Sequence, residues 1–265
     1  MTWLETVVIA IVEGITEFLP ISSTGHMIIT EKLLGVEDNE FTKLFTVGIQ
    51  LGAIAAVVIL YWKRFFLPLR NGNDAFSFYG KLLLAVAPAL ISGFFLAEWI
   101  DEMLEKPIYI GLSLILGGFV LLFIDGVFKN AHIENERQIQ FTQALWIGCW
   151  QCLALIPGVS RSAATMIGGM QQKFTRSLAA EFSFFMAVPT MVAATGYKFL
   201  KGYDQLNAEH LQLFVLGNIV AFVVALLTIT FFIGFLQKKG FRFFGYYRII
   251  AGTILLIGLA TGFIG

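Results

Sequence analysis

Two glutamates four residues apart are the first candidates for chemistry in this sequence. Glu13 and Glu17 lie in the segment E-G-I-T-E-F-L-P at 13–20, which contains no basic residue. Residues i and i+4 share one face of a helix, so both carboxylates are expected to point the same way. In an apolar stretch such a pair needs a cation, a water-filled cavity or a shared proton. The pair therefore predicts a divalent-cation site, for Mg²⁺ or Ca²⁺, and two glutamates that simply reach water are the alternative.

A run of hydroxyl residues follows the second glutamate, just after a proline turn. The segment S-S-T-G-H at 22–26 comes directly after Pro20 and Ile21. Hydroxyls and free N–H groups at the start of a helix favour an anion, and ordinary helix capping is the structural alternative. The candidates for binding or catalysis are Ser22, Ser23, Thr24 and Gly25. His26 is a further candidate as general acid, general base or nucleophile, although a lone histidine is more often structural.

A second polar segment, P-G-V-S-R-S at 157–162, contains the only charge between 141 and 172, which is Arg161. An arginine at membrane depth suggests function, and its planar fork suits a phosphate or a carboxylate. Hydroxyl donors surround it: Ser160, Ser162 and Thr165. The structural alternative is an ion pair between Arg161 and Glu13 or Glu17. The G-x-x-x-x-G-K motif is absent, which argues against nucleoside triphosphate hydrolysis.

The composition requires these residues to work in a membrane. The chain has 265 residues, of which 57% are hydrophobic and 14% are charged, whereas soluble domains carry about 25% charged residues. The 27 Phe and 5 Trp exclude disorder, and the balance of 18 basic and 18 acidic residues gives no support to a nucleic-acid partner. Cys149 and Cys152 lie in an apolar stretch, which favours a structural role over a redox role.

Six charge-free stretches approach or reach the length that crosses a membrane: 44–62, 82–97, 107–124, 182–197, 211–237 and 249–265. Two further apolar segments, at about 4–30 and 141–170, are broken by proline and glycine. Irregular backbone at membrane depth survives only inside protein or beside water. We therefore predict two re-entrant helix hairpins, each of which enters and leaves on one side.

The two halves of the chain resemble each other at an offset of about 140 residues. Residues 19–23 align with 156–160, and residues 40–42 align with 181–183. The prediction is a single all-α polytopic membrane domain built as an inverted repeat, about 1–130 and about 138–265. Each half contains one re-entrant hairpin and three transmembrane helices, and the site lies where the hairpins meet.

Charged loops predict the orientation of the domain. Basic residues follow the first, third and fifth predicted spans, whereas the loop at 98–106 contains four acidic residues and one lysine. The positive-inside rule places the basic loops in the cytoplasm and the acidic loop outside. Both termini are then expected outside, with the two hairpins entering from opposite faces.

The motif E-G-I-T-E-F-L-P-I-S-S-T-G-H at 13–26, together with P-G-V-S-R-S at 157–162, resembles the bacterial undecaprenyl-diphosphate phosphatase family, the BacA type of bacitracin resistance protein. The likeness covers essentially the whole chain. It implies removal of the terminal phosphate of undecaprenyl diphosphate, which regenerates the lipid carrier for cell-wall synthesis. It also implies a bacterial cytoplasmic (inner) membrane protein whose active site faces the outer, periplasmic side.

The resemblance also assigns roles to residues. The implied metal-associated residues are Glu13 and Glu17. The expected catalytic residues are Ser22, Ser23, His26, Glu17 and Arg161. Combined with the spacing, this makes Ser23 the preferred nucleophile and Ser22 the second choice, with His26 activating it or protonating a leaving oxygen. Attack by water or by His26 itself stays open.

The substrate is expected to bind with its phosphates in the polar pocket and its tail among lipids. Arg161 holds the phosphates together with Ser160, Ser162 and Thr165, and the partners are a polyprenyl diphosphate and membrane lipids. A homodimer is compatible with the sequence. The alternative function is a secondary transporter or flippase of an anionic lipid or a small anion, which broken helices and an inverted repeat would also serve.

Overall fold

The computed structural model describes residues 1–66, 72–202 and 206–262, and within these ranges it contains helices and no named strand. One isolated β-bridge joins Ile133 and Phe174. Six of the helical segments are long and apolar enough to cross a membrane: Glu40–Leu60, Asp74–Phe95, Pro107–Val127, Arg176–Gly202, Ala208–Lys239 and Arg242–Ala260. Each overlaps one predicted span, so the all-α polytopic prediction is confirmed. The end of the last predicted span, 263–265, lies outside the described residues.

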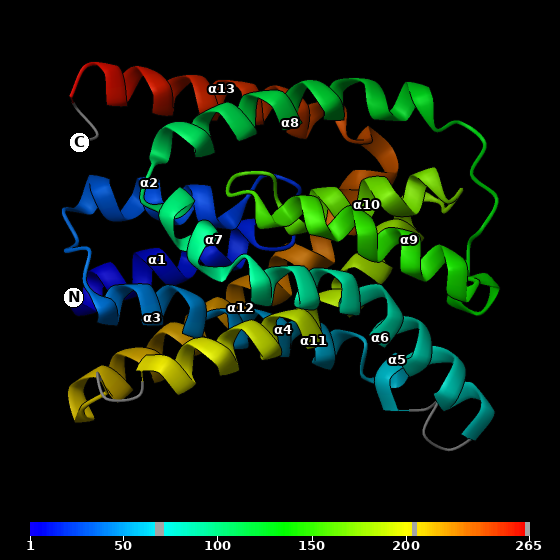
Figure 1. Ribbon diagram of the computed structural model, residues 1–265, viewed down its shortest axis with the longest axis horizontal. Helices are drawn as coiled ribbons and strands as arrows, with labels where there is room; N and C mark the ends of the chain where they lie inside the picture. The colour runs from blue at the N-terminus through cyan, green and yellow to red at the C-terminus, as the bar shows by residue number, and fades with distance from the viewer. Residues whose placement is uncertain (67–71, 203–205, 263–265) are drawn as a thin grey trace.

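The six long segments comprise α3 (Glu40–Gly48) with α4 (Gln50–Leu60), α6 (Gly72–Phe95), α8 (Pro107–Val127), α11 (Arg176–Gly202), α12 (Ala208–Lys239) and α13 (Arg242–Ala260). Short elements link them: α5 (Trp62–Phe66), α7 (Ala97–Leu104) and η2 (Glu136–Gln138). The strongest packing pairs α13 with α8, α6 with α9 (Phe141–Cys152), and α1 (Trp3–Thr16) with α12. Elements far apart in the chain therefore lie side by side and enclose the two hairpins (Figure 1).

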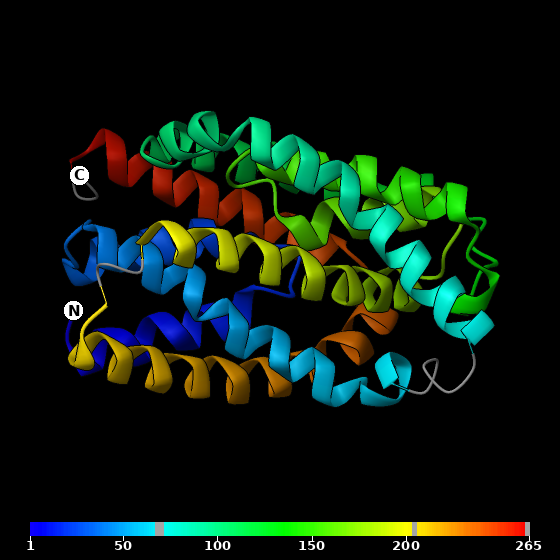
Figure 2. The ribbon, with the colours of Figure 1, turned by 60° about the horizontal axis from the view of Figure 1, so that its bottom comes forward.

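The two broken segments fold as hairpins, as the sequence predicts. One consists of α1 (Trp3–Thr16) and α2 (Ser23–Leu34), and the other of α9 (Phe141–Cys152), η3 (Leu153–Leu155) and α10 (Arg161–Gln171). Their turns meet near the middle of the molecule, and the hairpins open toward opposite ends (Figure 1). The N-terminus and the described end of α13 lie at the end toward which the first hairpin opens, and Figure 2 shows the same arrangement from another side.

The two hairpin turns repeat one local geometry. Ser22 and Ser160 each have a positive φ, 73° and 77°, and each side chain accepts a hydrogen bond from the backbone N–H three residues later. By their helix caps, Ser22 corresponds to Ser160. The sequence alignment of the two prolines instead pairs Ser23 with Ser160, so the two alignments differ by one residue. In the alignment by helix caps, Ser23 and Arg161 occupy the same place, the first residue of a returning helix. The inverted repeat of the complete halves stays a prediction.

A buried arginine from the last helix ties the two turns together. Arg248 of α13 is fully buried and donates hydrogen bonds to five backbone carbonyls. The acceptors are Pro20 (3.2 Å) in the first turn, Gly158 (2.9 Å) and Val159 (2.9 Å) in the second, and Ser113 (3.0 Å) and Leu114 (3.3 Å) in α8. Gly117 leaves the space for it, because a Cβ there would lie 2.2 Å from an Arg248 Nη2.

We expect Arg248→Met to lower the free energy of unfolding by at least about 3 kcal/mol, because it leaves several buried carbonyls without a donor. Thermal unfolding of the purified protein in detergent would measure the change. Arg242→Met is the matched control, since Arg242 is an exposed arginine at the start of the same helix. Equal melting temperatures for the two variants would contradict this role of Arg248.

Candidate active site

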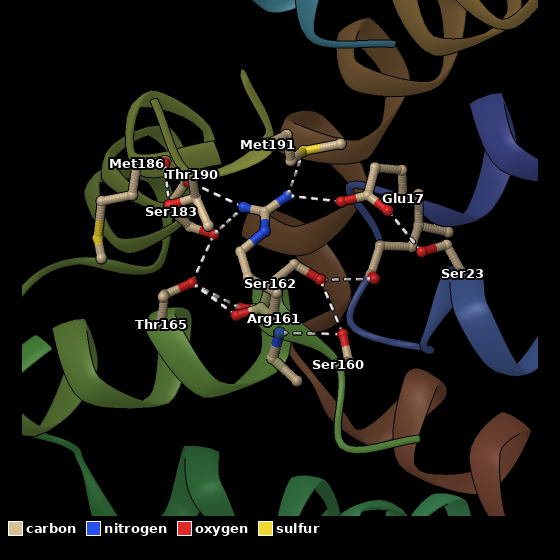
Figure 3. A network of polar contacts seen from close by, with 12 residues as sticks. Glu17, Ser23, Ser160, Arg161, Ser162, Thr165, Ser183, Met186, Thr190 and Met191 are labelled. Atoms are coloured by element: carbon tan, nitrogen blue, oxygen red, sulfur yellow. Dashed lines mark hydrogen bonds and ion pairs between the residues drawn. The ribbon is translucent and has the colours of Figure 1, made fainter. Parts of the chain in front are cut away.

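Three side chains from both hairpins form one chain of contacts where the two turns meet. The Ser23 hydroxyl donates to one Glu17 carboxylate oxygen at 2.5 Å, and Arg161 Nη2 donates to the other at 2.9 Å (Figure 3). Ser23 is 8% exposed and Glu17 is 8% exposed. A hydroxyl hydrogen-bonded to a carboxylate is an arrangement of nucleophile and base, and the arginine adds a fixed positive charge beside it.

The position of Arg161 is fixed by α11. Its Nη1 donates to the Ser183 carbonyl at 2.8 Å and to the Ser183 hydroxyl at 3.3 Å (Figure 3). The Thr165 hydroxyl lies 2.7 Å from that same Ser183 hydroxyl. Arg161 Nε is buried and has no hydrogen-bond partner in the described part of the chain. The guanidinium therefore keeps donor capacity that a phosphate oxygen could use.

Glu17, Ser23 and Arg161 face a cavity of about 760 Å³. The predicted site residues that line it are Glu17, Ser22, Ser23, Thr24, Ser160 and Arg161. Its wall continues past Leu104 of α7 to Lys201 at the end of α11, so it opens at the end of the molecule that holds the N-terminus and the described end of α13. Near this mouth, burial and the neighbouring Asp38 carboxylate raise the pKa of Glu31 to about 7, so negative charge at the mouth is reduced near neutral pH.

Apolar side chains make up much of the cavity wall away from the polar turn. They include Met27 and Ile28 of α2, Ile100 and Leu104 of α7, Leu155 of η3, and Met191 and Ala194 of α11. Ion pairs attach α7 to its neighbours, from Asp101 to Lys198 at 2.9 Å and from Glu105 to Lys43 at 3.8 Å. The cavity thus combines one polar end with walls suited to hydrocarbon.

Three predicted site residues form hydrogen bonds away from the cavity. The Ser162 hydroxyl donates to the Leu19 carbonyl at 2.7 Å, and the Thr165 hydroxyl donates to the Arg161 carbonyl at 2.9 Å. His26 Nδ1 lies 2.7 Å from the Ser22 carbonyl, and its Nε2 lies 2.7 Å from the Tyr247 hydroxyl. None of the three lines the cavity described above. Their contacts tie the two hairpins to each other and to α13, so their substrate or catalytic roles stay predictions.

Glu13 occupies a different environment from Glu17. It is fully buried, its oxygens accept no hydrogen bond from a donor group among the described residues, and its neighbour is the Glu17 carboxyl group. An ionised carboxylate in such a place is unfavourable without a cation, so Glu13 requires a proton or a metal. The described residues contain no cluster of three or more His, Cys, Asp or Glu that could hold a metal. Mg²⁺ needs only one or two carboxylates when phosphate oxygens and waters complete its shell, so the pair still fits that ion.

Gly25 and both cysteines also have defined surroundings. A Cβ on Gly25 would lie 3.0 Å from an Ile110 side-chain carbon of α8, so the glycine permits close packing at the start of α2. Cys149 is exposed and Cys152 is half-buried, and both thiols are free.

Two residues that position the site were not predicted from the sequence. Ser183 holds Arg161, and Arg248 holds both turns. The sequence did contain a signal for each. Ser183 is a hydroxyl residue between phenylalanines, and Arg248 is the last charged residue before a charge-free stretch. Neither signal indicates a partner more than 20 residues away.

The fold and the site define a polytopic α-helical membrane protein whose polar site is assembled from two broken-helix hairpins. Comparison with known sequences agrees with that class. A model of the family described as bacitracin resistance protein BacA matches residues 6–254, and the chain belongs to this family.

Named relatives cover almost the whole chain. The chain is 52% identical to an undecaprenyl-diphosphatase of Flavobacterium johnsoniae, over 97% of this chain and 96% of the relative. It is 49% identical to one of Porphyromonas gingivalis, over 99% and 98%, and 46% identical to one of Bdellovibrio bacteriovorus, over 99% and 98%. The resemblance expected from the two motifs is confirmed.

We expect the Glu17–Arg161 pair to show strong coupling in a double-mutant cycle with Glu17→Gln and Arg161→Met. Each single change leaves a buried polar or charged partner unsatisfied, so the coupling free energy should reach about 1.5–3 kcal/mol in thermal unfolding. The control cycle uses Lys198→Met and Asp101→Asn, whose exposed ion pair should couple by less than about 1 kcal/mol. Similar coupling free energies in the two cycles would show that the Glu17–Arg161 pair stabilises the fold no more than an exposed ion pair does.

Proposed function

We propose that this chain hydrolyses undecaprenyl diphosphate to undecaprenyl phosphate and inorganic phosphate. The observation that carries the proposal is the contact chain from Ser23 through Glu17 to Arg161 at the polar end of a cavity with apolar walls. The names of the relatives supply the substrate, because each is called an undecaprenyl-diphosphatase. A diphosphate on a long hydrocarbon chain matches a cavity of this composition.

The reaction starts at Ser23. Glu17 accepts the hydroxyl proton, and the Ser23 oxygen attacks the terminal phosphorus. The bond from that phosphorus to the bridging oxygen breaks, and undecaprenyl phosphate leaves with the electron pair. Water then attacks the phosphoserine, the bond from phosphorus to the Ser23 oxygen breaks, and Glu17 returns its proton to that oxygen. Inorganic phosphate leaves with the protons of the water, and the Ser23 hydroxyl and the Glu17 carboxylate are restored. Glu17 is preferred over His26 as the base because it contacts Ser23, whereas both ring nitrogens of His26 have other partners.

Arg161 provides charge stabilisation. Phosphoryl transfer depends mainly on positioning and on neutralising negative charge, and the arginine fork suits phosphate oxygens. Substrate phosphates would compete with Glu17 for the guanidinium, which frees the carboxylate to act as a base. Ser183 keeps Arg161 in place during that exchange, because it binds the opposite side of the guanidinium.

Ser22 serves as a positioning residue in this proposal. Its hydroxyl oxygen accepts the Gly25 N–H at 3.4 Å as the helix cap, which turns Ser23 toward Glu17. Thr24 and Ser160 line the same cavity and remain candidates for phosphate contacts. Substrate contacts by Ser162 and Thr165, as expected from the sequence, would require them to leave their present partners.

A divalent cation is also part of the proposal. Glu13 and Glu17 would hold it, and it would supply positive charge against the diphosphate. The Glu13 oxygens support this assignment, because they lie beside the Glu17 carboxyl group and accept no hydrogen bond from a donor group among the described residues. The residues of the chain still perform the proton transfer and the positioning described above.

We place the protein in the bacterial inner membrane with the cavity facing outward. The cavity opens at the end with the N-terminus, the described end of α13 and the acidic helix α7. The opposite end contains basic residues that include Lys63, Arg64, Lys173, Lys238 and Lys239. This distribution supports an outward site under the positive-inside rule. A homodimer stays a prediction, which cross-linking in native membranes would test.

The transporter or flippase alternative is not favoured. Broken helices suit transport equally well. A transporter does not, however, require a hydroxyl bonded to a carboxylate beside an arginine, and the relatives are named as phosphatases.

Phosphate release from undecaprenyl diphosphate by the purified protein in detergent should depend on one residue from each hairpin, Ser23 and Arg161. Ser23→Ala should lower kcat by at least about a thousandfold, and Arg161→Ala by about a hundredfold to a thousandfold. Ser177→Ala is the matched control, because Ser177 is a serine at the opposite end of the molecule that bonds Gln237. Full activity of a folded Ser23→Ala protein would remove Ser23 as the nucleophile and favour direct attack by water.

Chelation with EDTA should abolish phosphate release, and added Mg²⁺ or Ca²⁺ should restore it. Glu13→Gln should raise the metal concentration for half-maximal activity by roughly tenfold or more, because it removes a charged ligand. Glu37→Gln, at an exposed loop position, is the control. Activity that is indifferent to EDTA in both the parent and Glu13→Gln would eliminate the metal from the proposal.

A further inference from the structure

A second cavity of about 570 Å³ lies at the end of the molecule opposite the mouth of the candidate active-site cavity. It is formed by α5, α6, the loop that contains η2, and Phe182 of α11. These elements lie at the right in Figure 1, away from the N-terminus and the described end of α13. The two cavities share no lining residue, so the second one is not an extension of the site described above.

Lys81 is the unusual residue in this second cavity. It lines the cavity yet is only 7% exposed, and it follows Ser77 by one helical turn on the same face of α6. Across the described ranges Lys81 has no ion pair and no hydrogen bond from its amine, and its nearest aromatic contact is the Phe141 ring, at 5.9 Å to the centroid. The Lys81 Nζ is not among the fully buried polar atoms, so the stem of Lys81 is buried while the amine reaches the cavity, where the Glu136 carboxylate is a nearby opposite charge.

The other charges around the cavity leave positive charge in excess. Four basic residues line it, namely Lys63, Arg64, Lys81 and Arg137, against two acidic residues, Asp74 and Glu136. Glu136 forms an ion pair with Arg64, so one carboxylate is already neutralised. Ser77 and Asn135 add neutral polar groups. The cavity therefore suits a small anion with several acceptor oxygens, as a phosphate group has.

The surroundings of the cavity place it at the level of lipid headgroups. It lies at the ends of two apolar spans, Glu40–Leu60 and Asp74–Phe95. Exposed aromatic side chains flank it, with Trp62 and Phe66 on α5 and Phe76 on α6. Aromatic residues collect where a membrane meets water, and basic pockets between helices at that depth bind anionic headgroups.

We propose that this cavity binds the phosphate group of an anionic lipid in the leaflet opposite the candidate active site, with Lys81 as the central contact. A phosphate group from solution presents the same chemistry, so the experiment separates the two sources. This inference does not depend on the proposed phosphatase activity, because the ligand, the residues and the cavity all differ.

Native mass spectrometry of the detergent-solubilised protein would measure retention of phosphatidylglycerol, with phosphatidylcholine as the uncharged comparison. The parent protein should retain phosphatidylglycerol preferentially, and Lys81→Met should weaken that binding by roughly tenfold, because it removes one charge-assisted contact. Lys81→Arg should preserve it. The matched control is Lys239→Met, an exposed lysine at the same end that does not line the cavity.

A competing titration with inorganic phosphate identifies the source of the anion. Displacement of phosphatidylglycerol only at high phosphate concentration supports a lipid site, whereas tight binding of phosphate with no lipid preference assigns the same site to a soluble anion. Circular dichroism would confirm that Lys81→Met is folded, and Lys81→Gln provides a second neutral variant. Unchanged binding of both phosphatidylglycerol and phosphate in the folded Lys81 variants would overturn the proposal.

Discussion

The hydrogen bonding of backbone carbonyls at the two hairpin turns is the constraint on which this structure depends. A helix that stops in the middle of a membrane leaves carbonyl groups that neither water nor lipid can satisfy. The guanidinium of Arg248 meets that need for Pro20, Gly158 and Val159 at once, and it also reaches two carbonyls of α8. The two turns are therefore held against the same group, which fixes their distance from each other.

That fixed distance has a chemical consequence. Ser23 and Arg161 each begin the returning helix of a hairpin, and they meet at the Glu17 carboxylate. Neither hairpin alone contains a nucleophile, a base and a cation for phosphate. The site is thus a property of the packing between the hairpins. The neutral arrangement of Ser23, Glu17 and Arg161 also allows a polar cluster to stay buried until an anion competes for the arginine.

Most of the fold, and one contact of the site, could be predicted from the sequence. Long charge-free stretches and central prolines determine the spans and hairpins, and the ion pair between Glu17 and Arg161 was one of two stated alternatives for the arginine. The role of Arg248 could not be predicted, because a basic residue before an apolar stretch usually marks only the membrane interface. The partner of His26 was equally inaccessible, since Tyr247 lies 221 residues away along the chain.

The most direct test of the central claim is an experimental structure with a short-chain prenyl methylene-diphosphonate bound. The terminal phosphonate should lie between the Ser23 hydroxyl and the Arg161 guanidinium, with Arg161 turned from Glu17 toward the ligand and the turns still held by Arg248. A phosphonate bound away from both residues, with the contacts of Glu17 to Ser23 and Arg161 unchanged, would contradict it.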